Sequence, residues 1–155
     1  MAGTATERLT ELGLTLPAAA TPLGSYRPAV SLDDLVYTSG QLPLIGGELV
    51  ARGKVGAEVS IEDAAEAAKI AALNAVAAVA AVAGGVDKIN KIVKVVAFVA
   101  STPDFTAQPA VANGASDLLA AIFGDDGVHA RSAVGVVSLP LDAPVEVEII
   151  ARVVY

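Results

Sequence analysis

Three charged residues lie inside apolar stretches near the C-terminal end of the chain. Arg131 begins one strand-like run, and Glu146 and Glu148 lie within the next. Charged side chains are rarely buried unless they are paired. These positions therefore indicate either a solvated sheet edge or a small-molecule site built on a rigid sheet.

Arg131 is a candidate carboxylate-binding residue. Its planar guanidinium presents a fork of donors that matches the two oxygens of a carboxylate. A strand would also orient this group better than a loop would. The alternative interpretation is a surface arginine at the start of a strand.

Glu146 and Glu148 are two positions apart, so they share one face of a strand. One of them could orient a water molecule or transfer a proton, and the alternative is a solvated sheet face. If the last two strands formed a simple hairpin around Pro140–Ala143, Arg131 and Glu146 would lie roughly 20 Å apart, at about 3.3 Å per residue. A shared site would then need non-hairpin pairing or a second subunit.

Five further residues are polar or conformationally unusual enough to consider for a pocket. Tyr26 is either a loop tyrosine without a role or a ring that closes over a ligand. The Ser39-Gly40 pair could present backbone N–H groups, because glycine permits close approach. Asn113 marks either a helix irregularity or a pocket lining. The single histidine, His129, is interpreted as a polar loop residue, and no Ser/His/Asp triad assembles around it.

Composition limits the classes of function. The 155 residues are predicted to form one domain, and the net charge of −7 argues against nucleic-acid partners. The absence of cysteine, together with one histidine, argues against a cysteine- or histidine-based metal site. The N-terminus lacks the pattern of a signal peptide, and no apolar run is long enough to span a bilayer. We therefore expect a soluble cytoplasmic protein without a metal, cofactor or membrane partner.

The hydrophobic pattern predicts three short strands, a helix, a strand, a helix and two final strands. Helices interleaved in this way favour an α+β sandwich, with two helices packed on one face of a single mixed sheet. The long strand is apolar at nearly every position, so both of its faces should be covered. The expected ranges are a short N-terminal helix at Ala5–Leu14, strands at Ala29–Leu32, Leu35–Thr38 and Leu49–Val55, a helix at Ser60–Ala83 with a capping box, a strand at Ile89–Ala100, a helix at Val111–Phe123, and strands at Arg131–Leu139 and Val145–Val153.

Four segments, in order, resemble the RidA family, also called the YjgF or endoribonuclease L-PSP family. The resemblance runs from about Leu23 to Val153 and is closest to a longer-chain subgroup. The segments are YTSGQLP at Tyr37–Pro43, the alanine-rich helix around Asn74, VKVVAFVASTPDF at Val93–Phe105, and a C-terminal signature of ARSAV at Ala130–Val134, Leu139-Pro140 and VEVE at Val145–Glu148.

The resemblance implies a chorismate-mutase-like, ferredoxin-like fold and a homotrimer with ligand clefts between subunits. It implies hydrolysis of reactive enamines and imines to 2-keto acids and ammonia, without a cofactor. Matched residue by residue, Arg131 corresponds to the carboxylate-binding arginine and Glu146 to the glutamate that positions water. Tyr26 and Gly40, next to Ser39, correspond to pocket-lining positions.

The sequence also departs from the family pattern. Ala133 replaces a frequent cysteine, and Pro109 occupies the position of an asparagine unless an insertion brings Asn113 there. Leu118 and Leu119 replace aromatic residues, and residues 1–21 form an additional N-terminal helix and linker. Two alternatives to a deaminase therefore stay open: a non-catalytic protein that binds or senses small carboxylates, and a ribonuclease or translation inhibitor, against which the acidic charge argues.

Overall fold

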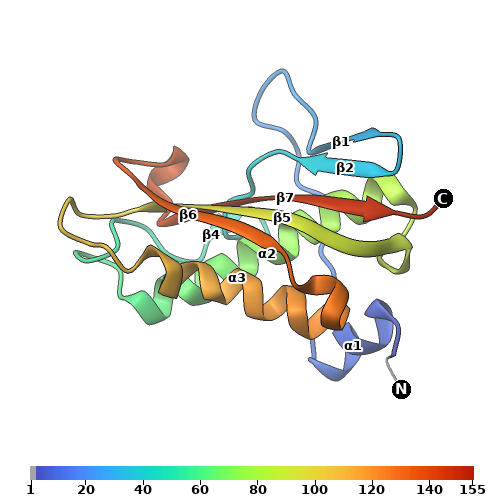
Figure 1. Cartoon of the computed structure of the whole chain (residues 1–155). Coiled ribbons are helices and arrows are strands. Elements are labelled where there is room, and N and C mark those ends of the chain that lie inside the picture. The colour runs from blue at the N-terminus through green and yellow to red at the C-terminus, as the bar shows by residue number, and fades with distance from the viewer. Residues whose placement is uncertain (1–2) are drawn as a thin grey trace.

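The computed structural model describes residues 3–155, and it confirms the α+β architecture. Five strands form one mixed sheet in the order β1-β2-β7-β5-β6, and β3 and β4 form a separate small hairpin. Figure 1 shows α2 and α3 on one side of the sheet. The elements are α1 (Ala5–Glu11), β1 (Ala29–Leu32), β2 (Leu35–Thr38), β3 (Leu44–Ile45), β4 (Glu48–Leu49), α2 (Ile61–Ala83), β5 (Ile89–Ala100), α3 (Gln108–Phe123), β6 (Ala130–Val136) and β7 (Val145–Val153).

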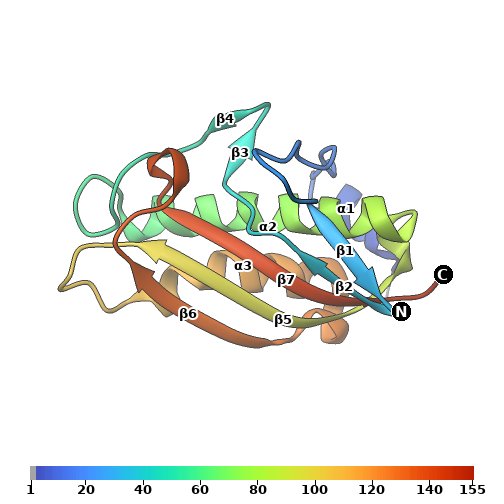
Figure 2. The ribbon, with the colours of Figure 1, turned by 90° about the horizontal axis from the view of Figure 1, so that it is seen from above.

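The last two strands are not a hairpin, so that assumption is wrong. β5 lies between them, parallel to β6 and antiparallel to β7 (Figure 2). A parallel pair needs a crossover, and α3 supplies it between β5 and β6. The chain then crosses over β5 through a short turn at Pro140–Asp142 before it enters β7.

The helix layer packs closely because its facing residues are small. α2 begins after Ser60, whose hydroxyl accepts a hydrogen bond from the Asp63 N–H at 3.1 Å. It ends at Gly84 in the left-handed conformation, as predicted. A Cβ on Gly114 of α3 would lie 1.9 Å from the Ala65 carbonyl oxygen, so glycine permits this contact. α2 is also the one described helix apolar and long enough to cross a membrane, but its residues form the core.

The other face of the sheet is open in the single chain. Register places Val95, Ala97 and Val99 of β5 toward the helices, and the alternate residues point away. The outward-pointing residues opposite Glu146 and Glu148 on β5 are half-buried, so within the single chain the expected cover of both β5 faces is incomplete. Large apolar side chains of the other strands are exposed on the same face. They include Val30, Leu32, Tyr37 and Val134.

Four predicted boundaries need correction. Leu49–Val55 is not a strand beyond Leu49, because Gly53 and Gly56 adopt positive φ angles that break extended pairing. α3 begins three residues before the predicted Val111, and β6 ends at Val136 rather than at Leu139. Helix α1 also ends at Glu11, earlier than predicted.

The N-terminal extension is attached to the helix layer. The Thr6 backbone N–H and hydroxyl donate to the Asp87 carboxylate at 2.9 and 2.8 Å, and Arg8 donates to the Ile122 carbonyl oxygen. Leu9 is buried in the core. The chain then passes to the opposite side of the sheet, where the segment before β1 rises above the open face (Figure 1).

Candidate functional site

Arg131 is held by two side chains of α3. Its Nη1 donates to Asn113 Oδ1 at 2.8 Å and to Ser116 Oγ at 3.0 Å. Among the described residues both hydrogen bonds of this guanidinium use Nη1, which leaves Nε and Nη2 for a ligand. Ala133 lies on the same face two positions later and packs against the core. We call Asn113, Ser116, His129 and Arg131 the Arg131 cluster.

Glu146 lies in a second place, a small cavity of about 100 Å³. Pro28, Gly40 and Pro140 line it near the sheet, and residues 20–23, where the N-terminal extension ends, form another wall. We call this cavity the Glu146 pocket. Tyr26 also lines it, and its phenol oxygen accepts a hydrogen bond from the Leu23 N–H at 3.1 Å. The ring of Tyr26 is thereby fixed beside the cavity.

The surroundings of Glu146 disfavour its charge. Burial of the carboxyl group raises the pKa of Glu146 above its ordinary value, and the neighbouring negative charge of Glu148 raises it further. A group placed at this cost in a cavity is a candidate for proton transfer or for holding a water molecule.

Gly40 makes room for that carboxylate. A Cβ at this position would lie 1.9 Å from Glu146 Oε1 and 2.7 Å from Cδ. Any other residue would therefore displace the glutamate. Ser39 is next to it, but its hydroxyl donates to the Arg27 carbonyl oxygen at 2.5 Å rather than facing the pocket. Gly40 thus lies against Glu146 in the wall of the pocket, whereas the Ser39 hydroxyl makes a contact within its loop.

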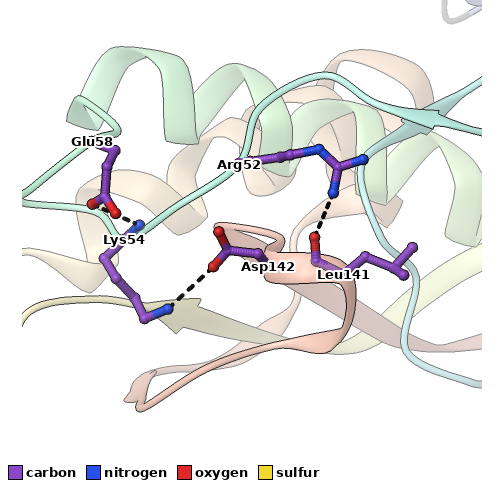
Figure 3. Close-up of polar contacts among 5 residues, drawn as sticks. All are labelled: Arg52, Lys54, Glu58, Leu141 and Asp142. Carbon is purple, nitrogen blue, oxygen red and sulfur yellow. Dashed lines mark hydrogen bonds and ion pairs between the residues drawn. The ribbon is translucent and has the colours of Figure 1, made fainter.

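The turn that leads into β7 is held from outside the sheet (Figure 3). Arg52 donates to the Leu141 carbonyl oxygen at 2.7 Å, and Lys54 Nζ lies 3.3 Å from Asp142 Oδ1. Leu141 and Asp142 both have positive φ angles, which cost free energy in residues other than glycine. These contacts fix the start of β7 and with it the position of Glu146.

The Arg131 cluster and the Glu146 pocket lie on opposite faces of the sheet. Arg131 pairs with Val95, which faces the helices, and Glu146 pairs with Phe98, which faces away. The two residues are also offset by about 10 Å along the strands and about 10 Å across them, from ordinary strand dimensions. Within one chain the two predicted catalytic residues therefore do not meet.

Sequence reasoning missed Ser116 and undervalued His129. Ser116 Oγ lies 2.8 Å from His129 Nε2, so the histidine belongs to the Arg131 cluster rather than to a free loop. One signal was present: Ser116 follows Asn113 by three positions in a helix, which places both on one face. The contact with His129 needs the fold-back at Gly124–Gly127, which the sequence marks only as a turn.

The Arg131 cluster and the Glu146 pocket, which we call the two half-sites, offer complementary chemistry. The Arg131 cluster presents an oriented cation suited to a carboxylate. The Glu146 pocket presents a partly desolvated carboxyl group that could hold water beside an electrophile.

Comparisons with known proteins agree with this architecture. A family described as "YjgF/chorismate mutase-like, putative endoribonuclease" matches residues 6–153. The chain is similar to protein TCP17 of Trypanosoma cruzi, with 41% identity covering 94% of this chain and 92% of the relative. Atu1372 of Agrobacterium tumefaciens shares 43% identity at a TM-score of 0.89, covering 97% of this chain and 94% of the other.

A more distant structure contains a ligand. Escherichia coli TdcF, solved with bound serine, shares 27% identity at a TM-score of 0.60, covering 89% of this chain and 94% of the other. The family match spans nearly the whole chain, and the fold, with its order of strands and helices, agrees with it. The chain therefore belongs to the YjgF/chorismate mutase-like family, also known as the endoribonuclease L-PSP family.

Proposed function

We propose that the protein hydrolyses reactive 2-imino acids and their enamine tautomers to 2-keto acids and ammonia. The reaction takes place in clefts that form between the subunits of a homotrimer. The observation that carries this proposal is the anchoring of Arg131 through Nη1, which leaves an edge of the guanidinium for the carboxylate of such a substrate.

The division of the site into two half-sites supports assembly. Arg131 and Glu146 face opposite sides of one sheet, so a common cleft requires them to come from different subunits. The exposed apolar side chains of the open face supply surface for such an assembly, since patches of this kind mark interaction sites. A heterologous contact repeated three times closes into a ring.

The chemistry needs few groups. Arg131 binds the substrate carboxylate through Nε and Nη2, and this contact orients C2. Glu146 holds a water molecule whose oxygen attacks C2 of the C=N bond. Glu146 takes one proton from this water and passes it to the imine nitrogen, which gives a carbinolamine. Glu146 then transfers the proton of the carbinolamine hydroxyl group to the amino group, the C–N bond breaks as the C=O bond forms, ammonia leaves, and a 2-keto acid remains. Positioning and partial exclusion of water supply the acceleration.

A specific observation favours a second candidate, the binding of a small carboxylate without catalysis. TdcF of E. coli contains bound serine, which also carries a carboxylate. Binding alone needs Arg131 but not the ionised form of Glu146. The ribonuclease activity in the family description is the less favoured alternative, because the net charge of −7 opposes binding of a polyanion.

The first experiment measures imine hydrolysis directly. 2-Aminoacrylate is generated from serine by a pyridoxal-phosphate dehydratase, and its decay is followed with and without this protein. We expect acceleration that Arg131→Ala abolishes and Glu146→Gln strongly reduces. Binding of pyruvate without acceleration of any imine would favour the carboxylate-binding alternative, and cleavage of RNA that survives in Arg131→Ala would favour the ribonuclease.

A complementation experiment tests the shared cleft. Co-expressed Arg131→Ala and Glu146→Gln chains can form clefts in which one subunit supplies an intact arginine and its neighbour an intact glutamate. Random mixing at equal amounts should restore about a quarter of the clefts. Each variant expressed alone is the control. Mixed trimers without activity would show that the two residues do not act across the interface.

A further inference from the structure

We infer that Ser116 and His129 are positioning residues that lock the guanidinium of Arg131 in its ligand-binding orientation. This inference rests on the proposed carboxylate-binding role of Arg131. It concerns a chain of three hydrogen bonds that begins at Arg131 and ends at the Gly127 carbonyl oxygen.

When the imidazole of His129 is neutral, the Gly127 carbonyl oxygen sets the direction of each of these three hydrogen bonds. A carbonyl oxygen only accepts, so His129 Nδ1, which lies 2.6 Å from the Gly127 oxygen, carries a proton. In the neutral imidazole Nε2 is then an acceptor, and it receives the hydroxyl proton of Ser116 at 2.8 Å. A lone pair of Ser116 Oγ is thereby oriented toward Arg131, whose Nη1 donates to it at 3.0 Å.

The consequence for Arg131 follows from counting its protons. Nη1 carries two N–H groups, and Asn113 Oδ1 and Ser116 Oγ accept one each. Two acceptors on one nitrogen fix the plane of the guanidinium as well as its position. The Nε–H and the Nη2 protons are then presented side by side, which is a geometry that binds both oxygens of a carboxylate.

The Gly127 end of this series of hydrogen bonds is rigid. Gly127 is buried, and a Cβ there would lie 2.1 Å from the Leu119 carbonyl oxygen, so its turn is packed directly on α3. Ser116, His129 and Arg131 together line a surface cavity of about 260 Å³. These three hydrogen bonds therefore connect α3, the turn at Gly124–Gly127 and the start of β6 at the place where a ligand would meet Arg131.

The same contacts could be taken for a nucleophilic serine activated by a histidine. In that arrangement the lone pairs of Ser116 must be available to an acyl carbon. Here Arg131 donates to one of these lone pairs, and all three hydrogen bonds form without a substrate. The geometry thus favours the support of Arg131 over covalent catalysis, and the two roles give different results in the test below.

The test begins with a measurement that needs no ligand. Side-chain ¹⁵N NMR of arginine reports how fast the guanidinium rotates about its Nε–Cζ bond. We expect slow rotation of Arg131 in the wild-type protein and clearly faster rotation in Ser116→Ala and His129→Phe. Ser116→Thr, which retains a hydroxyl, should restore slow rotation, and the exposed Ser138→Ala is the matched control. Unchanged rotation in Ser116→Ala would overturn the inference.

The second measurement compares pyruvate with its uncharged amide by calorimetry. Ser116→Ala should weaken pyruvate binding about tenfold and leave binding of the amide unchanged, since a charge-assisted contact is being misaligned. In the Arg131→Ala background Ser116→Ala should have no further effect. An equal loss in that background, or acylation of Ser116 by p-nitrophenyl acetate, would overturn the positioning role. If pyruvate binding does not depend on Arg131 at all, the proposed function fails. The NMR measurement still shows in that case whether Ser116 and His129 hold the guanidinium of Arg131.

Discussion

Replacement of Gly40 by alanine should disable Glu146 without unfolding the protein. The added Cβ would lie 1.9 Å from Glu146 Oε1, whereas real Cβ atoms essentially never approach closer than 3.0 Å. The carboxylate oxygen must therefore move by at least 1.1 Å, the difference between these two distances. A misplacement of about 1 Å in a catalytic group can cost about 100-fold in rate, or about 2.7 kcal/mol of transition-state stabilisation. We expect a loss of this size in kcat/KM for 2-aminoacrylate.

Two controls separate this effect from general damage. The φ angle of Gly40 is not positive, and its nearest contacts are atoms of a flexible side chain, so the free energy of unfolding in urea should change by less than about 1 kcal/mol. In the Glu146→Gln background Gly40→Ala should cost much less activity, because the group that it displaces has already lost its function. Full activity in Gly40→Ala, or an equal loss in both backgrounds, would refute the reasoning.

Three further predictions concern stability. Gly114→Ala should lower the free energy of unfolding by more than about 2 kcal/mol despite a gain in helix propensity, because its Cβ would overlap the backbone carbonyl of Ala65. Urea denaturation would measure this loss, and a variant more stable than the wild type would contradict the prediction. The raised pKa of Glu146 contributes stability that is present below pH 4.5 and is lost as the pH rises through the raised value. The free energy of unfolding of Glu146→Gln should therefore be modestly higher than that of the wild type at neutral pH, and the difference should vanish in acid. A less stable variant at neutral pH would show that burial does not disfavour the Glu146 carboxylate. Lys54→Met should change stability by less than about 1 kcal/mol, because the Lys54–Asp142 pair is solvent-accessible, and a larger loss in thermal unfolding would give that pair a greater role.

Local patterns predicted the elements best. The capping serine and terminal glycine of α2 bounded that helix correctly, because those signals depend only on neighbouring residues. The apolar run at Ile89–Ala100 predicted the bounds of β5 correctly. The placement of Arg131 on a strand is also confirmed. Both depend on short-range spacing.

Non-local pairing limited the prediction of the site. The sequence does not state that β5 separates β6 from β7, and this pairing decides which face each charged residue occupies. Likewise, Ser116 and His129 are 13 positions apart and meet only because the turn at Gly124–Gly127 folds back onto α3. Both arrangements are products of tertiary packing rather than of local propensity.

The features on the open face share an energetic character. Glu146 is partly desolvated beside Glu148, and several large apolar residues remain exposed. Each of these features disfavours the isolated chain, whereas the two Nη1 protons of Arg131, on the other face, find their acceptors within the chain. Such costs persist where function requires them. Their concentration on one face supports the proposed assembly, in which a second subunit covers this face and brings its own Arg131 to the Glu146 pocket.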